Sequence, residues 1–238
     1  MLPDLKSQAE SFAHKIEAIL NGTVTSEAKI VVTENFANHE VLDIVPEGSK
    51  VGKFALIPIT SFLAAGEEPW LWLRVWFQVK LIGPKGHFGI ESSSFGFTVS
   101  KESSRPIVRI EFDRDKGFEP DHDGVGLHVR NAAHVQIHGE SNDLGYVKGR
   151  LGLNPKKTLA DIHFPVGGRR FRPTLEDFIE FLHAEQLIPE LKPDAREVLN
   201  SNREEWLKIQ LKAAIENDID TSLEALKNLG YKIISSDG

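Results

Sequence analysis

Hydrophobic and polar residues alternate most regularly between residues 70 and 81. Successive side chains of a β-strand point to opposite faces of its sheet, so this alternation sorts the segment into two faces. One face carries Leu71, Leu73, Val75, Phe77, Val79 and Leu81, and the other carries Trp70, Trp72, Arg74, Trp76, Gln78 and Lys80. The pattern predicts a strand with one face in the core and a polar, tryptophan-rich face opposite.

Shorter segments rich in β-branched and aromatic residues flank this strand along the chain, and residues that favour turns separate them. The segment between residues 34 and 52 is rich in Asn, Glu, Pro and Gly and is predicted to be a loop. The other predicted strands are residues 28–33, 53–58, 88–90, 95–99, 107–113, 127–130, 134–140 and 160–164. Short turns between successive strands favour an antiparallel meander over parallel βαβ units.

Helices are predicted at both ends of the chain. The first is an amphipathic helix with its apolar stripe at Leu5, Ala9, Phe12, Ala13, Ile16 and Leu20 and a stop signal at Asn21-Gly22. Beyond Pro165 the chain is predicted to be helical. Thr174 followed by Asp177 resembles a capping box, a longer helix begins at Pro193-Asp194, and Thr221 with Glu224 is predicted to cap a last short helix that ends at Gly230.

These elements predict an α+β fold with an N-terminal helix, a twisted antiparallel sheet of about six strands and a C-terminal helical segment. We expect residues 1–165 to form the helix-and-sheet domain. Residues 166–238 are expected to form a helical segment packed on that domain.

Composition narrows the class of protein. The 238 residues include 35 acidic and 28 basic side chains, a formal net charge of −7, so the net charge does not favour a nucleic-acid partner, although a local basic patch leaves one open. The absence of cysteine excludes disulfides, cysteine-ligated zinc and thiol catalysis. The acidic opening residues do not resemble a signal peptide, and the apolar run at residues 70–81 is too short and too charged to span a bilayer. We therefore expect a cytoplasmic protein without a membrane partner.

The polar faces of the predicted strands could form one surface. It would combine Trp70, Trp72, Arg74, Trp76 and Gln78 with Arg109, Glu111, Asp113, His134, Gln136, His138, Glu140, Asp161 and His163. Aromatic rings beside acids, bases and imidazoles are typical of a ligand-binding surface. The alternative is a solvated sheet face on which opposite charges of neighbouring strands pair.

The spacing of His134 and His138 suggests a metal site only if both lie on a helix. On a strand, four residues separate them by roughly 13 Å, so they cannot bind one ion together. A metal would need ligands from different strands, such as His138 with His163 or Glu111. The acidic residues between 113 and 123 lack the ligand pattern of an EF-hand, so no calcium site is expected. We predict no metal and no cofactor.

A turn between residues 165 and 173 carries Arg169, Arg170 and Arg172 with two glycines just before a helix, where a phosphate could bind. Glu176 and Asp177 in the first turn of that helix would repel an anion. The alternative is a structural turn whose arginines pair with nearby acids.

No serine-hydrolase elbow, nucleotide-binding P-loop or dinucleotide-binding glycine motif is present. Acid–base chemistry needs a histidine oriented by a carboxylate, and His138 and His163 with Glu111 are the candidates. The ligand-binding candidates are His134, Gln136, Arg109, Trp72, Arg74, Arg169, Arg170 and Arg172.

The run AHVQIHGE at residues 133–140, together with DIHFPVGGRRFRPTLEDFIEFL at residues 161–182, resembles a family of uncharacterised actinobacterial proteins. The similarity extends to the helix that contains Trp206 and to the Leu229-Gly230-Tyr231 segment, and so covers roughly the second half of the chain. The resemblance implies a cytoplasmic bacterial protein. It assigns no activity and no catalytic residue.

Two functions of different classes are consistent with these patterns. The first is a protein that binds another protein or a small molecule through the polar sheet face or the C-terminal helices. The second is an acid–base enzyme that acts on a phosphate-containing substrate, such as a nucleotide or nucleic acid, held by the arginines. The two differ in whether His138, His163 and Glu111 lie within side-chain reach of one another.

Overall fold

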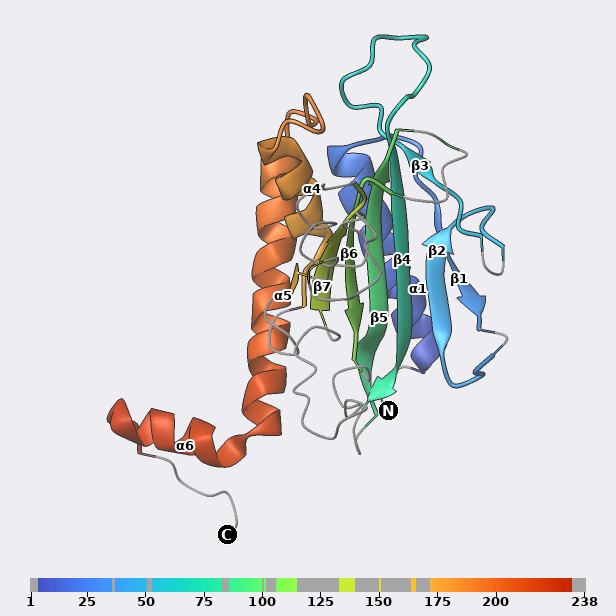
Figure 1. The fold of residues 1–238 in the computed structure, drawn as a ribbon. Coiled ribbons are helices and arrows are strands. Elements are labelled where there is room, and N and C mark those ends of the chain that lie inside the picture. The colour runs from blue at the N-terminus through green and yellow to red at the C-terminus, as the bar shows by residue number, and fades with distance from the viewer. Residues whose placement is uncertain are drawn as a thin grey trace.

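A computed structural model describes residues 4–35, 37–50, 53–82, 86–99, 101, 106–114, 133–139, 150, 164–165 and 172–232. Its helices and strands are α1 (Leu5–Thr23), β1 (Ile30–Glu34), β2 (Leu42–Pro46), β3 (Ile57–Pro58), β4 (Trp72–Ile82), β5 (His87–Thr98), β6 (Val108–Asp113), β7 (Ala133–Ile137), β8 (Phe164–Pro165), α4 (Leu175–Ala184), α5 (Ala195–Asn217) and α6 (Ile219–Asn228). Figure 1 shows their arrangement, with α1 behind the sheet and α5 along one side.

The described strands form one sheet in the order β1-β2-β4-β5-β6-β7-β8, and β3 pairs with β4 outside that path. Every pairing is antiparallel. The six longer strands are β1, β2, β4, β5, β6 and β7, whereas β3 and β8 have two residues each. The predicted α+β fold with its antiparallel sheet is therefore confirmed.

One face of the sheet is covered by helices and forms the core. Phe12 of α1 packs edge-on against Phe77 of β4 at 5.0 Å between ring centroids, and Phe178 of α4 stacks on Phe95 of β5 at 6.1 Å. Phe77 and Phe95 also contact each other. Helices α1 and α4 thus cover the same face, the one that the alternation along β4 assigned to the core.

Helix α1 runs through the predicted stop signal and ends at Thr23. A Cβ on Gly22 would lie 3.1 Å from Val198, so the bare glycine allows α5 to approach α1 closely. The Nζ of Lys192 donates to the Asn21 carbonyl over 2.7 Å, which places a cation at the carboxyl end of α1, where the helix dipole favours one. The helix thus ends one residue beyond the predicted stop signal, at the turn where α5 packs.

Four strands differ from the prediction. β3 covers only Ile57–Pro58 of the predicted residues 53–58, and β7 ends at Ile137 rather than at residue 140. The predicted loop contains β2, which forms because β1 and β4 pair with it on both sides. The predicted short strands at residues 88–90 and 95–99 are parts of the single strand β5. The serines between them are buried, and a bulge after Gln78 accommodates one extra residue in β5.

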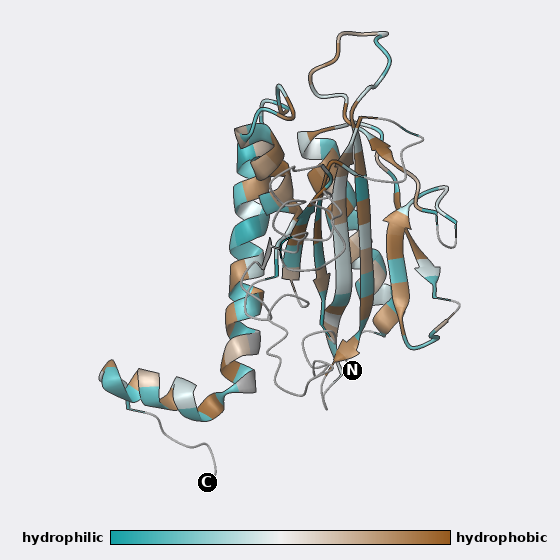
Figure 2. Cartoon of the chain, viewed as in Figure 1, coloured by the Kyte–Doolittle hydropathy of each residue, from teal (hydrophilic) through white to brown (hydrophobic). Residues whose placement is uncertain are grey.

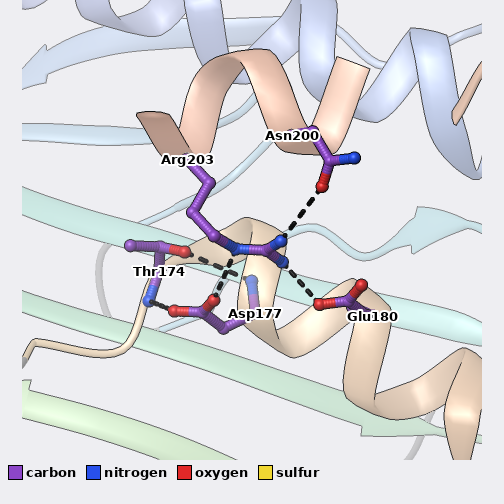
Figure 3. Close-up of polar contacts among 5 residues, drawn as sticks. All are labelled: Thr174, Asp177, Glu180, Asn200 and Arg203. Atoms are coloured by element: carbon purple, nitrogen blue, oxygen red, sulfur yellow. Dashed lines mark hydrogen bonds and ion pairs between the residues drawn. The ribbon is translucent and has the colours of Figure 1, made fainter. Parts of the chain in front are cut away.

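The predicted capping box of α4 is confirmed. Thr174 accepts a hydrogen bond from the backbone N–H of Asp177, and the Asp177 carboxylate accepts one from the backbone N–H of Thr174. The guanidinium of Arg203 in α5 also binds Asp177, Glu180 and Asn200, as Figure 3 shows. This cluster joins α4 to α5.

The last helix begins earlier than predicted. Asp218, rather than Thr221, caps α6 by accepting a hydrogen bond from the backbone N–H of Thr221. Gly230 has a φ of +86°, which fits the predicted end of the helix. None of the described helices is long and apolar enough to cross a membrane. The predicted division of the chain at residue 165 stays a prediction.

Candidate functional site

The face of the sheet opposite α1 and α4 is lined by polar and aromatic side chains, and we call it the polar face. It consists of Trp72, Arg74, Trp76 and Gln78 of β4, Ser92, Ser94, Gly96 and Thr98 of β5, Arg109, Glu111 and Asp113 of β6, and His134 and Gln136 of β7. The register aligns these residues in rows across the strands. On this face β5 contributes only small side chains, so the larger side chains of β4 and β6 can lean toward each other across β5.

One row centres on Glu111. The register places Glu111 opposite Ser94 on one side and His134 on the other. Its Oε1 accepts a hydrogen bond from the Ser94 hydroxyl over 3.3 Å, and its Oε2 lies 3.4 Å from His134 Nε2 and 3.3 Å from Arg109 Nη2. One carboxylate thus binds a hydroxyl, an imidazole and a guanidinium.

These contacts decide the charge state of Glu111. Burial raises the pKa of Glu111, but the hydrogen bond to His134 and the positive charge of Arg109 outweigh burial, so the pKa lies below its ordinary value. Glu111 is therefore an anion at neutral pH. A histidine oriented by such a carboxylate is the geometry that acid–base chemistry uses.

The next row holds two arginines. Arg74 lies opposite Gly96, Gly96 lies opposite Arg109, and Arg109 lies opposite Gln136. The Nε of Arg109 donates to the Gln136 side-chain oxygen over 3.0 Å, and its Nη2 binds the same oxygen. Gln136 and Glu111 therefore hold Arg109 in place from two sides.

Arg74 is held less completely. Its Nε is buried and has no hydrogen-bond acceptor among the described residues, and Arg74 forms no ion pair with them. Burial lowers the pKa of Arg74 and the like charge of Arg109 lowers it further, whereas Glu111 acts in the opposite direction. The described part of the polar face thus contains an arginine whose buried Nε–H has no acceptor among the described residues.

Aromatic contacts orient Arg74 and its neighbours. The Phe54 ring lies 4.6 Å from the Arg74 guanidinium carbon and 5.7 Å from the Trp76 ring. The Lys101 ammonium lies 5.3 Å from the Trp72 ring. The tryptophans alternate along β4 as predicted, but Phe54 and Lys101 cover Trp76 and Trp72, so these rings do not form an open stacking surface.

At the β2 side of the polar face, Asp43 accepts hydrogen bonds from Asn35 at 3.0 Å and from Gln78 at 3.4 Å. Burial raises the pKa of Asp43, and the hydrogen bonds from Asn35 and Gln78 oppose that shift. Asp43 therefore binds the two side-chain amides beside it.

The structure brings together only part of the predicted site. His134, Gln136, Arg109, Arg74, Trp72 and Glu111 share the polar face. His138 directly follows β7, and its backbone N–H donates to the Ile107 carbonyl. It is four residues away from His134, the histidine that contacts Glu111. The carboxylate is thus paired with His134 and not with His138. His163, Arg169 and Arg170, with Asp161, Glu140 and the predicted strand 127–130, lie outside the described residues.

Arg172 lies on the opposite side of the sheet. Its guanidinium carbon is 4.6 Å from the ring of Trp206, and Trp206 contacts Phe12 within the helical layer. Burial lowers the pKa of Arg172 to about 10, while Glu176 raises it. Arg172 therefore serves the packing of α4 and α5, and it cannot bind the same small ligand as Arg74 and Arg109.

Two features of this site were not predicted from the sequence. Small residues at Ser94 and Gly96 leave the space that Glu111 and the two arginines share, and their alternation with Phe95 and Phe97 was a signal of it. Phe54 comes from a segment outside the predicted polar face, and no local pattern marks its contact with Arg74. Among the described residues, no cluster of three or more His, Asp or Glu side chains could hold a metal ion.

Comparison of the chain with protein-family models, with curated proteins and with solved structures gives no match.

Proposed function

We propose that this chain is a binding protein whose polar face holds an anionic group of a small-molecule or protein ligand, with Arg74 as the residue that binds it. The observation that carries this proposal is the buried Arg74 Nε, which has no acceptor among the described residues although Arg74 lies one strand from a second arginine. Buried polar groups in folded proteins are nearly always hydrogen-bonded. A ligand oxygen would supply the acceptor that Arg74 lacks.

The charges around Arg74 support an anion. Arg74 and Arg109 contribute two positive charges, and the carboxylate that acts on Arg74 is Glu111, which already binds Arg109 and His134. A guanidinium presents planar N–H groups that match carboxylate and phosphate oxygens. Phe54 and Gln136 hold the two guanidinium groups in position, so little side-chain freedom is lost when an anion binds.

The proposal is tested by thermal unfolding in sodium phosphate, sodium citrate and sodium chloride at equal ionic strength. An anion that binds the folded state raises Tm with its concentration. We expect phosphate or citrate to raise Tm above the value in chloride, and we expect Arg74→Gln to remove that rise. Arg196→Gln, at an exposed arginine of α5, is the matched control and should keep it. An identical Tm in all three salts, or an unchanged rise in Arg74→Gln, would refute anion binding at Arg74.

The pairing of Glu111 with His134 favours a second candidate, an acid–base enzyme that acts on a phosphate-containing substrate. In that case Arg74 would hold the phosphate and His134 would transfer the proton. Hydrolysis of bis-p-nitrophenyl phosphate is a direct assay, in which His134→Asn should abolish release of p-nitrophenolate while the far-UV circular dichroism spectrum stays unchanged. Absence of turnover by the native protein would contradict the enzymatic role.

A further inference from the structure

Helix α6 forms at the end of the chain without burying any residue. It extends away from the sheet, as Figure 1 shows, and its apolar residues Ile219, Leu223 and Leu226 recur at spacings that place them on one side of the helix. Ile219 is 58% exposed. A helix of ten residues is marginal in water without tertiary packing, so α6 is expected to pack against a further surface.

The second half of α5 has a matching exposed stripe. Leu207, Leu211 and Ile215 are spaced by four residues, and Leu211 is 62% exposed. The first half of α5 is packed against the core through Val198 and Leu199. Figure 2 shows brown, apolar positions interspersed with teal, hydrophilic ones along α5 and α6, away from the sheet. We call the segment from residue 204 to residue 231 the arm.

Charged residues flank both stripes. On α6, Asp220, Glu224 and Lys227 each follow one of the apolar residues, so they lie along one flank of the apolar stripe. On α5, the corresponding flank carries Glu204, Lys208, Lys212 and Glu216 at intervals of four residues. Glu216 lies 3.9 Å from the Nε2 of His87. The other six of these side chains form no ion pair with a described residue of their own chain.

We propose that the arm is an interface between two copies of this chain, in which α6 of each copy packs antiparallel on the second half of α5 of the other. An antiparallel alignment brings equivalent flanks of two helices side by side. In one register Asp220 meets Lys212, Glu224 meets Lys208, and Lys227 meets Glu204 of the second copy. The same register places the apolar residues in contact, as Ile219 with Ile215, Leu223 with Leu211, and Leu226 with Leu207.

Because α6 is complementary to the second half of α5, the arm fits a second copy of the same chain. One chain carries both halves of the interface, so a twofold axis creates the helix pairing twice, as closed dimers require. An unrelated partner would not require the charges of α6 to match those of α5 in order and in spacing.

The alternative in which α6 folds back on α5 of its own chain is distinguishable. In the structure, only Asp218 separates the two helices, and α6 is turned away from α5 (Figure 1). A fold-back would bury the same residues within one chain. It would give a monomer, whereas the exchange gives a dimer.

The test is a charge exchange followed by sedimentation velocity on the full chain. One variant carries Lys208→Glu and Lys212→Glu, and the other carries Asp220→Lys and Glu224→Lys. The native chain should sediment as a dimer. Each variant alone places like charges across both copies of the interface, so its dissociation constant should rise about tenfold or more.

A mixture of the two variants tests whether restoring the charge pairs restores the dimer. In a one-to-one complex the reversed α5 of one variant meets the reversed α6 of the other, and the remaining α5 and α6 are native, so every pair is attractive again. We expect the mixture to form the dimer that neither variant forms alone. Lys6→Glu with Lys50→Glu makes the same change of charge at exposed sites outside the arm and should leave the native dimer unchanged.

A native chain that sediments as a monomer, variants that dimerise as well as the native chain, or a mixture that stays monomeric would each overturn the proposal. Circular dichroism of each variant confirms that the sheet domain is folded, so a monomeric variant reports on the interface.

Discussion

Arg203 of α5 donates its Nε–H to the Asp177 carboxylate of α4 over 3.1 Å. The other oxygen of the same carboxylate accepts the backbone N–H of Thr174 and completes the capping box (Figure 3). Arg203 also binds Glu180 through Nη2 at 2.6 Å. A single guanidinium therefore connects α5 to the first turn of α4.

Replacing Arg203 by Met should lower the free energy of unfolding by about 0.2–1 kcal/mol, the range for exposed ion pairs. Because Asp177 and Glu180 are largely exposed, the effect should shrink in high salt. Urea unfolding at low and high salt measures both quantities. Arg196→Met, at an exposed arginine that forms no ion pair with a described residue, is the control, and an equal loss in that variant would contradict the role of Arg203.

Phe178→Ala should cost about 3–5 kcal/mol, because Phe178 is fully buried and stacks on Phe95 between α4 and the sheet. Phe181 on the same helix is 38% exposed and stacks on Phe178, so it offers a matched control. Phe181→Ala should cost much less. Chemical denaturation of both variants gives the comparison, and equal losses would show that α4 does not anchor the core through Phe178.

Glu111→Gln should destabilise the protein at neutral pH. In the folded state the pKa of Glu111 lies below its ordinary value, so ionised Glu111 stabilises the fold at any pH above the ordinary carboxyl pKa. This stabilisation is lost as the pH falls through the lowered pKa of the folded state. The difference in unfolding free energy between native protein and Glu111→Gln should therefore be largest near pH 7 and vanish in acid. Glu10→Gln, at an exposed carboxylate of α1, is the control. A difference that does not depend on pH would contradict the assignment.

Glu176→Gln should have the opposite effect. Burial raises the pKa of Glu176 above its ordinary value, and Oε1 is buried without a hydrogen-bond partner among the described residues. Its ionised form therefore costs stability at neutral pH, and that cost is relieved as pH falls through the raised pKa of the folded state. We expect Glu176→Gln to be more stable than the native protein at pH 7 and to lose this advantage below the ordinary carboxyl pKa. Unfolding curves across that pH range test it, and a destabilised Glu176→Gln at pH 7 would show that the charge is needed by Arg172.

Local patterns were sufficient for the elements whose signals lie within a few residues. The alternation at residues 70–81 predicted β4 and its two faces, and Thr174 with Asp177 predicted the start of α4. Both rest on short-range geometry, which is period two in a strand and a three-residue reach at a helix start. The same reasoning predicted which side chains of β6 and β7 share the polar face.

Other elements depend on neighbours that are distant in sequence. β2 lies in a segment rich in Asn, Glu, Pro and Gly, and it becomes a strand because β1 and β4 hydrogen-bond to it. The serines of β5 favour strand structure weakly, yet the strand continues through them because β4 and β6 pair with both of its edges. The close approach of Val198 in α5 to Gly22 in α1 is likewise a contact between residues far apart in sequence.

The α+β class, the two faces of β4 and the residue types on the polar face could be predicted because they follow from local spacing along the chain. The contact of Glu111 with His134 rather than His138, and the separation of Arg172 from Arg74 and Arg109 by the sheet, could not be predicted in this way. The register of strands far apart in sequence and the packing of α4 and α5 set those distances. The face of the sheet on which a side chain lies depends on local spacing, whereas the residue it contacts depends on how distant segments pack together.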